Sequence, residues 1–299
     1  MSYRTALSEI LTSVIAPAAE LTGVRGRFPR GAVTALGRAG LLGLTVSTAY
    51  GGGGEGLPEA ADVVARTARV CPATAAVLQS HYAAVAVIEA YGGSWVRAEI
   101  AAGRHLSSLA LTETEAFGET DVLGEADALV KTGALAETDA LGETDAFGET
   151  DAFGEGGLLA PHSTAVRSGD VVALRARKYR VVAAGEADSY VWSSRPLAAR
   201  DRLDGLTLWG VPAHAPDLFV PARPGGAGPC GSGTSTVFAD PVLVPADAML
   251  GADGAGLDIL RRTVLPWLRE LRAAGSAGVQ APQVVGVTTP RPAASLAPS

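Results

Sequence analysis

An acidic tandem repeat divides this chain and limits what the residues on either side of it can form. From Phe117 to Leu159 a large apolar residue recurs every six positions, and the best-preserved units read Leu-Gly-Glu-Thr-Asp-Ala from 141 and Phe-Gly-Glu-Thr-Asp-Ala from 147. Apolar positions recur about every 3.6 residues on a helix and every 2 residues on a half-buried strand. A period of six therefore predicts neither element.

The repeat leaves several interpretations open. Hexapeptide periodicity is typical of left-handed β-helices, but Asp fills the fifth position, which should be small and inward-facing, and stacked acidic ladders would repel each other. Calcium binding is disfavoured because the glycine-rich nine-residue pattern is absent. We interpret residues 114–157 as a solvated acidic insertion produced by tandem duplication.

Charge is concentrated in the same place. Residues 113–157 hold 13 Asp and Glu against one Lys, a net charge of −12, whereas the remaining 23 Lys and Arg against 18 Asp and Glu give +5. No Lys/Arg cluster with interleaved aromatic residues occurs, which argues against a nucleic-acid partner. At 299 residues and 47% hydrophobic content, the chain can bury a real core.

Cysteine usage and hydropathy predict a cytoplasmic protein. Cys71 and Cys230 are isolated and lack CxxC or Cys/His spacing, so we expect core or surface thiols and no metal site. The N-terminus shows no basic start followed by an apolar stretch, and no window reaches the ~18 apolar residues of a membrane span.

The first hundred residues read as helices joined by glycine turns. Apolar residues at spacings of three and four predict an amphipathic N-terminal helix that Pro17 disrupts or kinks. Further helices are expected over Gly31–Ala39, Leu57–Val70, Ala73–Tyr91 and Trp95–Ala102. Ala73–Tyr91 is apolar on nearly every face, which predicts burial on most sides and makes His81 a packed residue rather than a ligand.

The glycine run Gly51–Gly54 predicts a permissive turn. A phosphate-binding loop would need Lys and Ser/Thr after the glycines, or a G-x-G-x-x-G between strand and helix. Here Glu-Gly-Leu-Pro follows, which disfavours a nucleotide phosphate site.

Past the repeat the apolar period becomes two. Strands are expected over Leu106–Glu113 before the repeat and over Val171–Val182, Ser189–Ser194, Leu206–Val211 and Thr234–Phe238 after it. A last helix is expected from Asp253 to about Gln280, and the proline-containing residues beyond it read as a flexible tail.

This order of elements, together with several local strings, resembles the acyl-CoA dehydrogenase family. Leu-Gly-Arg-Ala-Gly-Leu-Leu-Gly-Leu from 36, followed by Tyr-Gly-Gly-Gly-Gly from 50, is similar to the family's entry into its helical domain. Thr112-Glu113 resembles the T-E motif beside the flavin. The string from Gly231 to Pro245, followed by Met-Leu-Gly, resembles the end of the family's β domain.

The resemblance implies an α+β fold with four parts. They are an N-terminal helical domain over 1–105, a middle antiparallel β domain over 106–250 with the insertion at 114–157, the first helix of a truncated C-terminal helical domain over 251–280, and a Pro-rich tail over 281–299. It also implies a flavoenzyme that removes hydrogens from the α and β carbons of an acyl thioester such as an acyl-CoA, with FAD as hydride acceptor.

The implied flavin contacts are incomplete. Thr112 and Glu113 would lie at the flavin ring, but the family's K-x-W-[IV]-T strand reads here Lys-Tyr-Arg-Val-Val from 178. Arg180 replaces the Trp that packs on the flavin and Val182 replaces the Thr that bonds near its N5 atom. Tyr179 could stack instead only if the strand slipped by one residue, which would turn every side chain to the other face.

The catalytic base stays unknown, because the family supplies it from the C-terminal helices that the truncation removes. The resemblance therefore predicts impaired activity and weak FAD binding. It also predicts that apolar residues of the last helix, Ile259, Val264, Trp267 and Leu271, are exposed and mediate homo-oligomer or partner-subunit contact. The alternative is a non-catalytic relative that serves as an acyl-thioester-binding or partner-binding scaffold.

Overall fold

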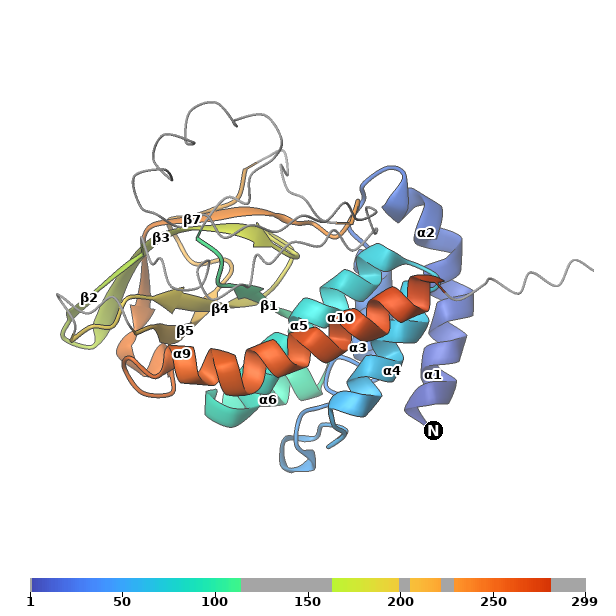
Figure 1. Cartoon of the computed structure of the whole chain (residues 1–299), viewed down its shortest axis with the longest axis horizontal. Helices are drawn as coiled ribbons and strands as arrows, with labels where there is room; N and C mark the ends of the chain where they lie inside the picture. The colour runs from blue at the N-terminus through green and yellow to red at the C-terminus, as the bar shows by residue number, and fades with distance from the viewer. Residues whose placement is uncertain (1, 114–162, 199–204, 222–228, 281–299) are drawn as a thin grey trace, which may run out of the picture.

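Helices come first, two sheets follow, and a long helix closes the described chain (Figure 1). The structure, a computed structural model, describes residues 2–113, 163–198, 205–221 and 229–280. The helical elements are α1 (Tyr3–Ile10), η1 (Leu11–Ile15), α2 (Ala16–Gly23), α3 (Arg30–Arg38), η2 (Thr48–Tyr50), α4 (Leu57–Ala68), α5 (Pro72–Tyr91), α6 (Ser94–Ala101), η3 (Ala246–Ala248), α9 (Gly256–Ile259), η4 (Leu260–Val264) and α10 (Leu265–Gln280). The strands are β1 (Ser107–Ala110), β2 (Thr164–Ser168), β3 (Val171–Val181), β4 (Ser189–Ser194), β5 (Thr207–Pro212), β6 (Leu218–Phe219), β7 (Ser235–Pro245) and β8 (Met249–Leu250).

The central helix α5 is buried along most of its length, as its uniform apolar pattern predicts. His81 lies within it and is fully buried. Its Nε2 lies 2.9 Å from the carbonyl oxygen of Leu42, and its Nδ1 accepts the backbone N–H of Ser107 at 3.2 Å. This confirms the prediction of a packed histidine, which here joins α5 to the start of β1.

The regular α-helix is disrupted just before Pro17, as expected, although the chain stays helical through it. The π-helical turn η1 precedes it, and the N–H of Ala16 bonds to Leu11 five residues back. The wider turn moves backbone carbonyls away from the proline ring, so the helix runs on into α2. The same arrangement recurs at Pro266, the second residue of α10, which follows the π-helical turn η4.

The glycine run forms a tight turn against the preceding loop. A Cβ at Gly52 would stand 2.2 Å from the carbonyl oxygen of Val46, and one at Gly53 would stand 2.6 Å from that of Leu44. The N–H groups of Gly53 and Gly54 bond to the carbonyls of Gly43 and Val46. These donors are therefore committed within the turn.

The β region consists of two four-stranded sheets, in the orders β1-β4-β5-β8 and β2-β3-β7-β6. Every pair between neighbouring strands is antiparallel except β1 with β4, which is parallel, with Ser107 opposite Ser189. Trp192 on β4 faces Trp209 on β5, and both are fully buried. The strands β6 and β8 have only two residues each, so an alternating apolar pattern in the sequence cannot predict them.

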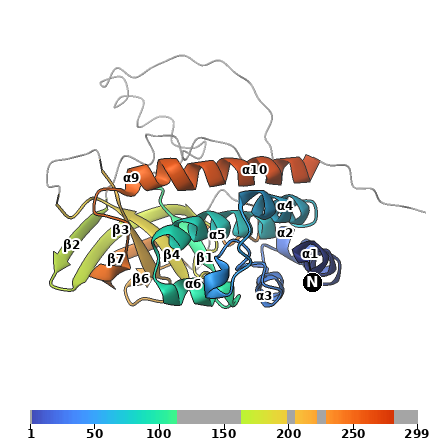
Figure 2. The same cartoon turned by 90° about the horizontal axis from the view of Figure 1, so that it is seen from below.

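The closing helix lies against the helical domain, which corrects the expectation of an exposed apolar face. α10 runs along α4 and α5 in both views (Figures 1 and 2). Ile259, Val264 and Leu271 are buried, and Trp267 is partly buried against the same core. The N-terminal helices cover the residues that were expected to need a partner.

Two of the expected segments cannot be compared with the structure. The repeat at 114–157 and the tail at 281–299 lie outside the described residues. Among the described helices, none is long and apolar enough to cross a membrane.

Candidate functional site

The end of β1 meets the end of β3 at the junction of the two sheets. The backbone N–H of Tyr179 donates to the carbonyl oxygen of Thr112 at 2.8 Å. The hydroxyl of Ser108 donates to the carbonyl oxygen of Val182 at 2.6 Å. The two segments that carry the predicted flavin residues, about 65 positions apart in sequence, are therefore in direct contact.

A buried ion pair reinforces this junction. Glu113 and Lys178 pair through Oε1 and Nζ, and their side chains are 4% and 0% exposed. Nζ also donates to the hydroxyl of Ser193 on β4 at 2.8 Å, and Glu113 Oε2 accepts the backbone N–H of Ser163 at 3.1 Å. In the sequence, Lys178 was informative only for the alignment of a strand. The signal for its role is a lysine at a position where β3 turns its side chains inward.

The electrostatics of Lys178 follow from its burial. Loss of hydration lowers the pKa of the Lys178 ammonium to about 8, although the adjacent Glu113 carboxylate pulls it upward. The ammonium also lies 5.4 Å from the centre of the Trp192 ring, whose negative face favours a cation. Lys178 is therefore mostly protonated at neutral pH.

A β-bulge sets the direction of the residues that follow Lys178. Lys178 pairs with Val237 and Val181 pairs with Ser235, so Tyr179 and Arg180 together oppose a single residue of β7. Arg180 has a φ of 55°, in the left-handed region that non-glycine residues rarely adopt. A second irregularity in the β3–β7 register lies between Leu174 and Ala176.

These residues fit the flavin implied by the resemblance only in part. Thr112 is buried at the junction and Tyr179 offers a partly exposed ring, over which the guanidinium of Arg177 lies at 4.8 Å. Val182 packs against the core and has no side-chain donor. Arg177 thus already occupies one face of the Tyr179 ring, and Val182 supplies no hydroxyl of the kind that the resemblance implies near the flavin N5 atom.

The buried carboxylate of this junction is poorly suited to act as a base. Glu113 is the one buried Asp or Glu among the described residues. Lys178 and the N–H of Ser163 occupy its two oxygens. Proton abstraction would have to break a buried ion pair, which is costly.

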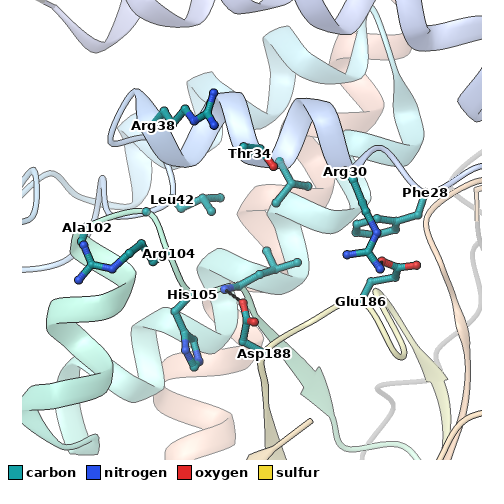
Figure 3. A pocket seen from close by; sticks show the side chains of 13 residues that line it. Phe28, Arg30, Thr34, Arg38, Leu42, Ala102, Arg104, His105, Glu186 and Asp188 are labelled. Carbon is teal, nitrogen blue, oxygen red and sulfur yellow. Dashed lines mark hydrogen bonds and ion pairs between the residues drawn. The ribbon is translucent and has the colours of Figure 1, made fainter. Parts of the chain in front are cut away.

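A hollow of about 440 Å³ lies between α3 and the turn before β4 (Figure 3). Its charged residues are largely engaged with protein partners: Arg30 pairs with Glu186, Arg104 pairs with Glu99, and Asp188 accepts the N–H of Leu106 at 2.7 Å. The residues predicted for the flavin do not line it.

Comparison with known proteins identifies what this chain is similar to. Residues 2–103 match the family described as Acyl-CoA dehydrogenase, N-terminal domain. An acyl-CoA dehydrogenase from Bacillus subtilis (strain 168) is 23% identical over 250 residues, which cover 82% of this chain and 56% of that protein.

Solved structures show the same fold. Butyryl-CoA dehydrogenase from Megasphaera elsdenii superposes with a TM-score of 0.72 at 19% identity, covering 92% of this chain and 64% of that one. TdsC from Paenibacillus sp. A11-2, solved with FMN and indole, gives 0.69 at 15% identity, covering 92% and 61%. The resemblance to the acyl-CoA dehydrogenase family is thus confirmed, as is the α+β fold, while the chain spans only a little over half the length of its curated relative.

Proposed function

We propose that this chain, with the N-terminal domain and the fold of the acyl-CoA dehydrogenases, is a flavoprotein of that kind whose dehydrogenation of acyl thioesters is impaired. The observation that carries the proposal is the hydrogen bond between Tyr179 and Thr112. It brings together the two segments that the family resemblance assigns to the flavin. A relative of the same fold was solved with FMN, which supports a flavin here.

The residues of this chain would hold FAD without completing its usual surroundings. Thr112 would lie at the edge of the ring system and Tyr179 would supply an aromatic surface. Acceptance of a hydride from the β carbon is the chemistry that a bound flavin supplies. Arg180 and Val182 remove a stacking surface and a hydrogen-bond donor, which weakens binding and leaves the N5 region without its hydroxyl partner.

A non-catalytic scaffold that binds an acyl thioester is the second candidate. It is favoured by Glu113, whose oxygens are committed to Lys178 and Ser163 and are therefore unavailable for removing an α-proton. The two candidates differ in flavin binding and in turnover.

The visible absorbance of the purified protein, before and after addition of FAD, separates them. We expect a nearly colourless preparation that binds added FAD weakly and saturably. Butyryl-CoA added without oxygen should bleach the bound flavin slowly or not at all. A protein that takes up no FAD would rule out the flavoprotein, whereas rapid bleaching would contradict the impairment.

A further inference from the structure

Four buried polar residues form a cluster at the junction of the two sheets, which we call the Lys178 cluster: Glu113, Ser163, Lys178 and Ser193. All four residues are buried, and Lys178 and Ser163 are fully excluded from solvent. The cluster joins the segment that follows β1, the residue before β2, the second half of β3 and the penultimate residue of β4.

Stability alone is a poor reason for such a cluster. The cost of removing two charges from water offsets much of the free energy gained from their mutual attraction. Apolar residues of similar volume often stabilise a core as well or better. Hydrogen bonds and ion pairs are directional, whereas apolar packing is not. They fix the positions of the backbone segments that carry them.

The bonds of the cluster are arranged in a chain that ends on backbone groups. The Ser193 hydroxyl accepts from Lys178 Nζ at 2.8 Å and donates to the carbonyl of Leu111 at 3.2 Å. Lys178 thereby orients a hydroxyl that holds the backbone at Leu111, one residue past β1 and one residue before Thr112. On the other side, Glu113 connects Lys178 to the N–H of Ser163.

The segments fixed in this way are those that carry the candidate flavin residues. Thr112 lies between Leu111 and Glu113, which both bond to the cluster, directly or through Ser193. Tyr179 and Arg180 follow Lys178 immediately and form the bulge, in which Arg180 holds a left-handed conformation. A strained bulge persists only where its surroundings hold it in place.

We propose that Lys178 and Glu113 are positioning residues for the flavin segment, which hold Thr112 and the Tyr179–Arg180 bulge in the arrangement that binds the ring system. This inference rests on the proposed function, since it assigns a role at the same site. It predicts that the charged pair matters more for FAD binding than for folding.

The test compares the wild-type chain with Lys178→Met and with the double change Lys178→Met and Glu113→Leu. The single change leaves Glu113 buried without its counter-ion, which destabilises the fold. The double change replaces the pair by apolar side chains of similar size. Arg104→Met, which breaks the exposed pair with Glu99, serves as a matched control.

Two measurements are made on each folded variant, in addition to its melting temperature. Calorimetric titration with FAD gives the dissociation constant, and hydrogen exchange followed by mass spectrometry gives local opening of peptides 106–113 and 177–184 relative to α5. For the double variant we expect a melting temperature close to wild type, FAD binding weaker by about tenfold or more, and faster exchange in those two peptides alone. The Arg104→Met variant should match the wild type in both.

The outcomes separate this inference from the function on which it rests. A double variant that matches the wild type in FAD affinity and in exchange would reduce the pair to a structural element and overturn the inference. If the wild type takes up no FAD, the proposed function fails. The positioning role of Lys178 and Glu113 is then tested by hydrogen exchange alone. Local loosening of the two peptides then retains the pair as a positioning element, and uniform loosening overturns that role.

Discussion

Glu113 accepts a hydrogen bond at Oε2 from the backbone N–H of Ser163 at 3.1 Å. These residues flank the range 114–162 on either side, so the chain re-enters the described fold beside the point at which it leaves. Both residues belong to the Lys178 cluster, which fixes that point by bonds to β3 and β4.

We predict from this contact that the repeat is dispensable for folding. Replacing residues 114–157 with a short Gly/Ser turn leaves the Glu113–Ser163 contact within easy reach. It also removes a loop whose closure costs on the order of 1–3 kcal/mol by the logarithmic length rule. The melting temperature, followed by circular dichroism, should stay the same or rise. Loss of the cooperative transition on deletion would show that the repeat is structural.

His81 should make the protein sensitive to acid. Burial lowers the pKa of its imidazole from 6.5 to about 4, so the unfolded chain binds the proton more readily than the folded one. The stability that depends on neutral His81 is present above pH 6.5 and is lost as the pH falls toward 4. By that shift, the free energy of unfolding should fall by roughly 3 kcal/mol over the window.

The change His81→Gln tests this account through urea denaturation at several pH values. It should flatten the pH dependence of the free energy of unfolding between pH 6.5 and 4. His105 contributes to the same window because burial also lowers its pKa, so some slope should survive in the His81 variant. An unchanged slope in that variant would contradict the assignment to His81.

Leu271 should be a major stabilising contact between the closing helix and the helical domain. It is fully buried on α10, which packs against α4 and α5. Leu271→Ala should lower the free energy of unfolding by about 2–5 kcal/mol, because it leaves a cavity in a close-packed region. Arg269→Ala, on the exposed side of the same helix, should change it by less than about 0.5 kcal/mol. Equal effects of the two changes would show that α10 does not pack as described.

The sequence was informative where local pattern decides the structure. The uniform apolar character of α5 predicts its burial, and the β-favouring residues of Ser189–Ser194 predict β4 with its observed bounds. It was uninformative where a distant partner decides. The apolar side of α10 was visible, but not that α4 and α5 cover it.

The candidate site follows the same rule. A lysine in a strand is normally exposed, and Lys178 is buried only because Glu113, 65 positions earlier, neutralises it. The bulge at Tyr179 and Arg180 depends on the pairing of β3 with β7, which no local motif in β3 specifies. The resemblance located the segments, while their contact emerged only from the fold.

The most direct test of the account is calorimetric titration of FAD into the wild-type chain and into the double variant Arg180→Trp with Val182→Thr. The wild type should bind weakly, because a lost aromatic stack and a lost hydrogen bond each cost ~0.5–1.5 kcal/mol. The double variant should bind roughly ten- to a hundredfold more tightly. Arg167→Trp, on the exposed edge strand β2, should give no gain. FAD binding that is undetectable in the wild type and not restored in the double variant would contradict a flavin site at the junction of Thr112 and Tyr179.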